Sequence, residues 1–145
     1  MTDQTPQTVR VSRQFTQSPE RVFDAWLDPA KAGKFLFATP AGQMVRVEIE
    51  PRVGGTFRFV DRRDGVDAEH FGEYVVIDRP RRLVFDFAVS AMPEAKTRVT
   101  IEIRPVGAGC ELTLSHAGVP ADYVARTSHG WAMILDGLAA VVAGD

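Results

Sequence analysis

The chain has 145 residues, a length that predicts a single domain with a buried core. Its residues are 45% hydrophobic and 25% charged, which excludes the disordered and fibrous classes. The formal net charge of -2 argues against nucleic acid as the main partner, because phosphate binding needs a surplus of Lys and Arg.

Three features of the sequence bear on the compartment. Cys110 is the single cysteine, so the chain forms no internal disulfide. The longest apolar stretch, Leu138 to Ala143, is far too short to span a membrane. Residues 1–8 have neither the basic nor the apolar region of a signal peptide. We therefore expect a cytoplasmic protein with a disordered tail at residues 1–8 and one domain at residues 9–145.

The first half of the chain predicts a strand followed by short helices. Val9 and Val11 alternate with polar residues, as in a strand. Ser18-Pro19-Glu20 is a helix start, with Ser as the N-cap and Pro in the first turn. Asp28-Pro29 ends that helix, because the residue before proline is disfavoured in helical conformation. A second short helix is expected at residues 30–36.

From residue 43 the apolar residues recur with period two, which predicts strands joined by short turns. We expect inward-facing side chains at Val45, Val47, Ile49, Phe57, Phe59, Phe71, Val75, Ile77, Leu83, Phe85, Phe87, Val99, Ile101, Ile103, Leu112 and Leu114. Residues 61–67 are expected to form a charged hairpin connection. Gly54 and Gly55 lie in a turn that can use positive φ.

The C-terminal segment returns to helical spacing. Its apolar stripe consists of Trp131, Ile134, Leu135, Leu138, Val141 and Val142. A break is expected near residues 128–130, since Gly130 and Gly137 each disfavour a helix by about 1 kcal/mol relative to Ala. The stripe needs an apolar partner, so this helix should lie across the dry face of the sheet. The sequence therefore predicts an α+β helix-grip fold: a curved antiparallel sheet of about seven strands around a long C-terminal helix.

Several motifs resemble the bacterial AHSA-like family, which comprises homologues of the activator of the 90-kDa heat-shock protein ATPase. They are Ser18-Pro19-Glu20-Arg21-Val22-Phe23-Asp24-Ala25-Trp26, Pro51-Arg52-Val53-Gly54-Gly55-Thr56-Phe57-Arg58-Phe59, Gly72-Glu73-Tyr74, Pro80-Arg81-Arg82-Leu83-Val84-Phe85 and Leu112-Thr113-Leu114-Ser115-His116, with Gly130-Trp131 near the end. The resemblance covers residues 9–143 and places the chain in the START and birch-pollen-allergen (SRPBCC) superfamily. It implies hydrophobic-ligand binding, polyketide cyclisation or co-chaperone activity. One segment departs from the family, because Gly33 to Pro40 lacks the usual tryptophan pair and Gly-Pro.

A curved sheet leaves space wherever the helix does not reach it, and we expect a small hydrophobic or aromatic ligand there. The candidate ligand-binding residues are Phe35, Phe37, Phe57, Phe59, Phe71, Glu73, Phe85, Phe87, His116, Trp131 and Leu135. We expect only the aromatic residues near the open end of the sheet to touch the ligand. Because they share strand faces with inward-facing apolar residues, Glu73 and His116 should also face inward and serve as polar anchors of an apolar pocket.

The alternatives to ligand binding are a cyclase or hydrolase that uses Glu73 or His116 as acid or base, and a chaperone-associated protein-binding module. The sequence indicates no cofactor, since Gly54-Gly55 precedes a strand and not a helix. It indicates no metal, because its three histidines have no ligand spacing. A homodimer could form through an exposed strand edge or helix face.

Overall fold

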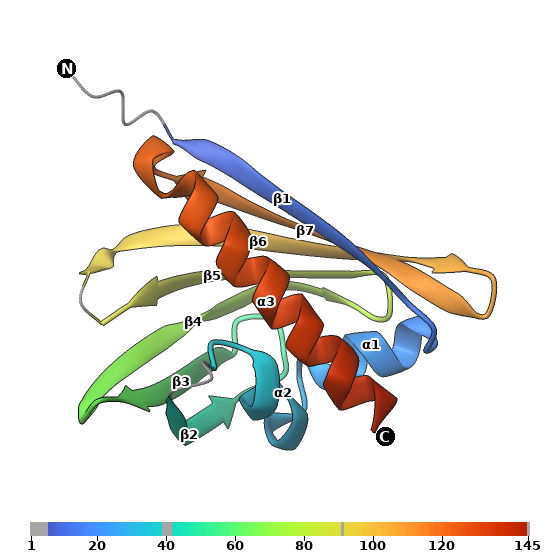
Figure 1. Cartoon of the computed structure of the whole chain (residues 1–145), viewed down its shortest axis with the longest axis horizontal. Coiled ribbons are helices and arrows are strands. Elements are labelled where there is room, and N and C mark those ends of the chain that lie inside the picture. The colour runs from blue at the N-terminus through green and yellow to red at the C-terminus, as the bar shows by residue number, and fades with distance from the viewer. Residues whose placement is uncertain (1–5, 39–41, 91, 145) are drawn as a thin grey trace.

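The computed structural model describes residues 6–38, 42–90 and 92–144, so Thr39 and Pro40 of the divergent segment lie outside it. One seven-stranded antiparallel sheet has the order β1-β7-β6-β5-β4-β3-β2. Its strands are β1 (Gln7–Phe15), β2 (Gln43–Ile49), β3 (Thr56–Arg63), β4 (Val66–Asp78), β5 (Arg82–Val89), β6 (Met92–Val106) and β7 (Gly109–Val119). The long C-terminal helix crosses the sheet diagonally (Figure 1). The helix-grip fold is confirmed.

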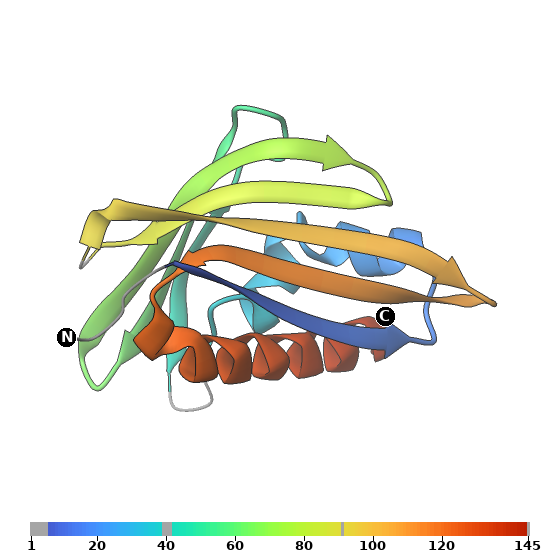
Figure 2. The same ribbon diagram turned by 90° about the horizontal axis from the view of Figure 1, so that it is seen from above.

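Two short helices follow β1, as predicted. Helix α1 (Pro19–Ala25) is capped by the Ser18 hydroxyl, which accepts from the Arg21 amide at 3.3 Å. Helix α2 (Pro29–Phe35) is capped by Asp28, whose carboxylate accepts from the Ala30 amide at 3.0 Å. Both helices lie on the concave side of the sheet (Figure 2).

Helix α3 (Val124–Ala143) follows a single 3-10 turn, η1 (Ala121–Tyr123). The break predicted near residues 128–130 is wrong, because α3 is continuous through Gly130. Its stripe packs on the sheet as expected, with Trp131, Leu135, Leu138 and Val142 buried. The stripe covers enough apolar surface to hold the glycine-containing turns in the helix.

Strand β4 overturns part of the predicted sheet pattern. A bulge between Tyr74 and Val76 shifts the register by one residue. Tyr74 is therefore buried and Glu73 is exposed, although period two counted back from Ile77 predicts the opposite. A second bulge, between Met44 and Arg46 in β2, leaves Val45 exposed on the edge strand.

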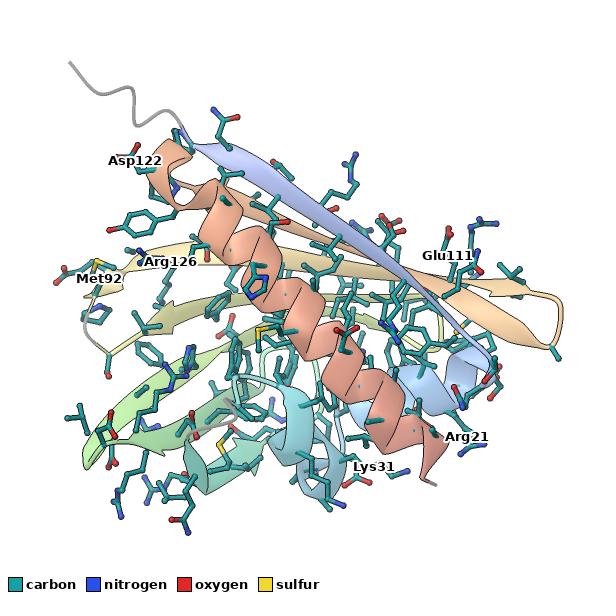
Figure 3. All side chains as sticks on the ribbon, viewed as in Figure 1. Arg21, Lys31, Met92, Glu111, Asp122 and Arg126 are labelled. Carbon is teal, nitrogen blue, oxygen red and sulfur yellow. The ribbon has the colours of Figure 1, made fainter. Side chains whose placement is uncertain are left out.

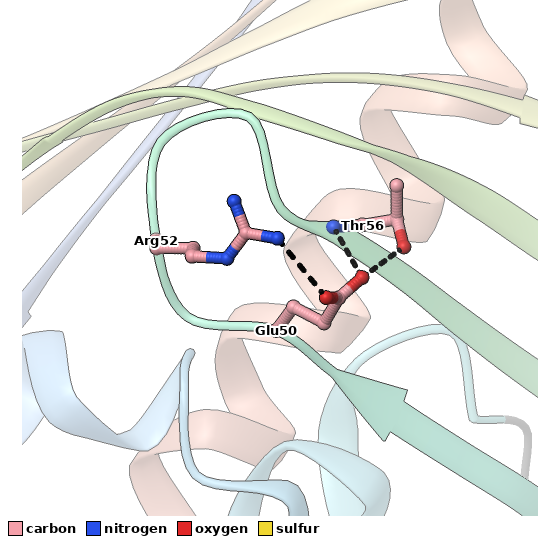
Figure 4. Close-up of polar contacts among 3 residues, drawn as sticks. All are labelled: Glu50, Arg52 and Thr56. Atoms are coloured by element: carbon pink, nitrogen blue, oxygen red, sulfur yellow. Dashed lines mark hydrogen bonds and ion pairs between the residues drawn. The ribbon is translucent and has the colours of Figure 1, made fainter.

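Two turns show why the strands pair as they do. The predicted connection at residues 61–67 shrinks to Asp64 and Gly65, both at positive φ (50° and 77°), as a two-residue hairpin requires. In the β2–β3 turn, Glu50 accepts from the Thr56 hydroxyl at 2.7 Å and pairs with Arg52 (Figure 4). Gly54 has φ 83° in this turn, so the expected use of positive φ is confirmed.

The N-terminal boundary lies slightly earlier than the sequence suggests. Strand β1 begins at Gln7, which pairs with Val119 of β7, so Gln7 and Thr8 belong to the sheet. Residues 1–5 of the expected tail lie outside the described part of the chain.

The turn between β4 and β5 is held against α1 by two hydrogen bonds of 2.7 and 2.8 Å that the Arg79 guanidinium donates to the Asp24 carboxylate.

Candidate functional site

The centre of the molecule is filled with side chains. Phe59, Phe85 and Leu135 are at most 2% exposed, and Phe57 is 4% exposed. The Phe57 and Phe85 rings pack edge to face with centroids 5.3 Å apart. These four predicted ligand residues are therefore core residues. Two hollows remain on the concave side of the sheet, one beside the start of α3 and one between α2 and α3.

The first hollow, called here the sheet-end hollow, has a volume of about 430 Å³ and lies between β5, β6, β7 and the start of α3. Its apolar wall includes Phe87, Val89, Val119 and Tyr123. Thr97 and His116 supply polar atoms from β6 and β7, and Lys96 and Thr127 also line the hollow. Figure 3 shows Met92, which also lines this hollow, at the same end of the molecule as Asp122 and Arg126. The volume falls in the ~300–1,000 Å³ range of small-molecule sites.

A directed hydrogen-bond chain ends at this hollow. The Trp131 indole N–H donates to Nδ1 of His116 at 3.0 Å. Nε2 of His116 lies 2.7 Å from the Thr97 hydroxyl. Because an indole can only donate, Nδ1 must carry the lone pair, and the hydrogen of the neutral ring is on Nε2. Thr97 therefore accepts from His116, and its own hydroxyl hydrogen is available to an acceptor in the hollow.

His116 is suited to this structural role and not to proton transfer. It is 7% exposed, and burial lowers the pKa of its imidazole to about 4. The ring is therefore neutral at pH 7, with both nitrogens already hydrogen-bonded. The predicted inward orientation of His116 is confirmed.

The second hollow, called here the helix-pair hollow, also has a volume of about 430 Å³. It lies between α2, α3 and the hairpin end of β3 and β4, against Phe35, Phe37 and Ile134. A Cβ placed on Gly130 would meet no atom within 4 Å, so this glycine leaves part of the hollow empty. A Cβ on Gly137 would lie 3.1 Å from that of Phe35, which shows how closely α2 approaches α3.

Arg63 and His70 form the polar side of the helix-pair hollow, and the buried Asp61 pairs with Arg63 without lining the hollow itself. Asp61 is 1% exposed and accepts from Nε of Arg63 at 2.8 Å. The His70 ring stacks on Phe37 with centroids 4.2 Å apart and an angle of 8°. Burial, with a further contribution from Arg63, lowers the pKa of His70 to about 4, so this ring is also neutral at pH 7.

The structure separates the predicted site residues into five groups, of which the core residues Phe57, Phe59, Phe85 and Leu135 are the first. Phe35 and Phe37 line the helix-pair hollow, and Phe87 and His116 line the sheet-end hollow. Trp131 lies behind His116. Phe71 and Glu73 lie on the outer face of β4. Their expected inward orientation is wrong, because the bulge between Tyr74 and Val76 shifts the alternation of the strand by one residue.

Sequence reasoning missed Asp61, Arg63, His70 and Thr97. Asp61 and Arg63 continue the alternation of Phe57 and Phe59, and only the expected hairpin at residues 61–67 hid them. Thr97 lies on the same face of β6 as Val99, but it precedes the residue at which the sequence predicted that strand to begin. The parity of His70 was hidden by the bulge.

A third hollow, larger than these two, lies on the outer face of the sheet and has a volume of about 710 Å³. Its lining is mostly charged, and several of these charges pair within the sheet, as Arg104 does with Glu111 at 2.8 Å. It lacks the apolar wall of the other two. Within the described residues, no group of three or more His, Cys, Asp and Glu side chains is placed to hold a metal ion.

Comparison with known proteins agrees with this architecture. The sequence profile described as "Activator of Hsp90 ATPase homolog 1-like protein" matches residues 16–143. The chain belongs to this family. A search of curated proteins found no match.

Solved structures resemble the chain over nearly its whole length. Protein CV1439 from Chromobacterium violaceum is 26% identical, with a TM-score of 0.84 over 93% of this chain and 96% of that one. Mll3558 from Rhizobium loti is 25% identical, with a TM-score of 0.80 over 97% and 99%. SA2116 from Staphylococcus aureus, at 16% identity and a TM-score of 0.87 over 97% and 96%, shares the fold. None of the helices in the described residues is long and apolar enough to cross a membrane.

Proposed function

We propose that the protein binds a small, apolar, ring-containing molecule that carries a hydrogen-bond acceptor, and that the sheet-end hollow is the binding site. The observation that supports this most is the chain from Trp131 through His116 to Thr97. It presents one oriented hydroxyl donor in a hollow whose lining is mainly apolar, with Lys96, Tyr123 and Thr127 at its other polar positions. Few polar groups in fixed positions within an apolar hollow are typical of a small-molecule site.

The orientation of the donor is set by the protein before a ligand arrives. Trp131 and His116 are both buried, at 4% and 7% exposure, so neither ring has alternative partners in water. The hydroxyl of Thr97 has no acceptor for its own hydrogen among the described residues. A ligand carbonyl can take that hydrogen, and a hydrocarbon of the same shape leaves it unused.

The enzyme alternative has less support from the geometry. Glu73 lies on the opposite face of the sheet from both hollows. His116 is neutral with both nitrogens engaged, which leaves it no free lone pair for a general base. Binding to a chaperone, homodimer formation and a cytoplasmic location stay predictions.

The test compares 1-indanone with indane, two rigid bicyclic molecules that differ in a carbonyl group. Titration of the ¹⁵N-labelled protein by NMR should show shifts around Thr97, Val119 and Thr127. One hydrogen bond is worth roughly 1 kcal/mol, so the ketone should bind about fivefold more tightly. Equal affinities, or shifts confined to other parts of the chain, would contradict the proposal.

Three variants test the hydroxyl donor of Thr97 and the volume of the sheet-end hollow separately. Thr97→Val should remove the preference for the ketone, whereas Thr97→Ser keeps a hydroxyl and should retain it. Thr127→Trp places a large ring in the hollow and should abolish binding of both molecules. Native mass spectrometry of the protein from its own host, followed by denaturing extraction, would then identify the natural ligand class.

A further inference from the structure

The helix-pair hollow has a different chemistry from the sheet-end hollow. Its floor is apolar, built from Phe35, Phe37 and Ile134. Its charged lining residues are Lys34 and Arg63, both positive, and no carboxylate lines it among the described residues. An apolar floor with a cationic side is complementary to a molecule that has a hydrophobic body and a negative group.

Arg63 is held in position by the protein. Its Nε donates to Asp61 at 2.8 Å, and its Nη2 donates to the Phe37 carbonyl at 3.4 Å. Among the described residues none accepts a hydrogen bond from Nη1. Asp61 offsets part of the charge of Arg63, but it is 1% exposed and so presents no surface to a ligand. Lys34, which is exposed at the end of α2, adds a second positive charge.

The apolar part of the hollow is kept open by α3. The space beside Gly130 is empty, since a Cβ added there would meet no atom within 4 Å. Met133, at 44% exposure, lies on the rim beside it. The Phe37 ring stacks on His70, whose neutral ring adds no charge to this side. The result is a preformed space beside two cations.

We propose that the helix-pair hollow is a second binding site, independent of the first, for an organic carboxylate with an apolar ring or chain. The carboxylate pairs with Arg63 and Lys34, and the apolar body lies over Gly130 against Phe35 and Phe37. Charge-assisted hydrogen bonds to Arg are stronger than neutral ones, so the charge contributes to selectivity as well as affinity.

The test uses 2-naphthoate and its neutral analogue 2-naphthamide, measured by NMR titration of the full chain. The carboxylate should bind roughly tenfold more tightly, and its affinity should fall as NaCl is raised. Arg63→Gln and Lys34→Gln should each reduce that preference, whereas Arg63→Lys should retain most of it. Lys34→Gln changes an exposed residue, so it tests the charge without risk to folding.

Two space-filling variants assign each probe to its hollow. Gly130→Leu should abolish binding of 2-naphthoate and leave that of 1-indanone intact. Thr127→Trp should do the reverse, so each variant is the control for the other. Binding of 2-naphthoate that survives Gly130→Leu, or that matches the amide in affinity, would overturn this inference without affecting the proposal for the sheet-end hollow.

Discussion

The rings of Phe37 and Phe87 lie 5.2 Å apart between centroids, and each lines a different hollow. Trp131 completes the wall between them, 6.0 Å from Phe37 and 6.4 Å from Phe87. The space beneath α3 is therefore divided by three aromatic side chains. This division explains why one fold offers two hollows with distinct polar groups.

Removing part of the wall should change both stability and binding. Phe87→Ala deletes a buried ring and should lower the free energy of unfolding by about 3–5 kcal/mol, measured by urea denaturation. It should also weaken 1-indanone binding. Phe71→Ala is the matched control, because Phe71 is only half-buried on the outer face, and it should leave that binding unchanged. Equal effects of the two variants would contradict the assigned orientations.

The hydrogen-bond chain predicts one tautomer of His116. The ¹⁵N chemical shifts of its ring should show a hydrogen on Nε2 and a lone pair on Nδ1, as the Trp131 donor requires. These shifts should stay constant from pH 8 to pH 5, because burial lowers the pKa of His116 to about 4. A hydrogen on Nδ1, or titration near ~6.5, the pKa of a free histidine, would refute the proposed hydrogen-bond chain.

Stability should depend on pH through His70 and His116. Burial lowers both pKa values from 6.5 to about 4, so in the window between these values the unfolded chain binds protons that the folded chain does not. The free energy of unfolding should therefore fall as pH drops from 6.5 to 4, by about 3 kcal/mol per histidine. Above 6.5 neither histidine contributes to the pH dependence.

His70→Phe isolates one of these histidines. Phenylalanine keeps a ring against Phe37 and removes the titrating group. Urea denaturation at pH 7 and pH 5 should show a smaller difference in unfolding free energy for the variant than for the wild type. An unchanged difference would show that His70 is not neutral in the folded protein.

The two glycines of α3 should respond differently to alanine. Gly130→Ala should stabilise the protein by up to about 1 kcal/mol, because the helix gains a better former and the new Cβ meets nothing. Gly137→Ala places a Cβ 3.1 Å from that of Phe35, so crowding should offset the gain. Thermal unfolding of both variants checks the contrast. A greater gain for Gly137→Ala would contradict the described packing of α2 on α3.

Periodicity and local capping signals were sufficient for most of the fold. The Ser18-Pro19 and Asp28-Pro29 signals placed both short helices, since caps act through local hydrogen bonds. The stripe from Trp131 to Val142 predicted the helix that crosses the sheet. It also outweighed the local propensity of Gly130, so the predicted break does not occur, because tertiary packing dominates helix stability.

The candidate site was harder to predict because it depends on register and on contacts between distant strands. A single extra residue in β4 reversed the faces of Phe71 and Glu73 and hid His70. The pairing of Thr97 with His116 and of His116 with Trp131 joins three elements, which no local pattern encodes. The hollow therefore emerges only once the strands are aligned.

A crystal structure of the protein with 1-indanone bound tests the central claim most directly. We expect the ketone ring in the sheet-end hollow, with its carbonyl oxygen about 2.7–3.0 Å from Oγ1 of Thr97. A ketone that lies elsewhere, or whose carbonyl points away from Thr97, would contradict it.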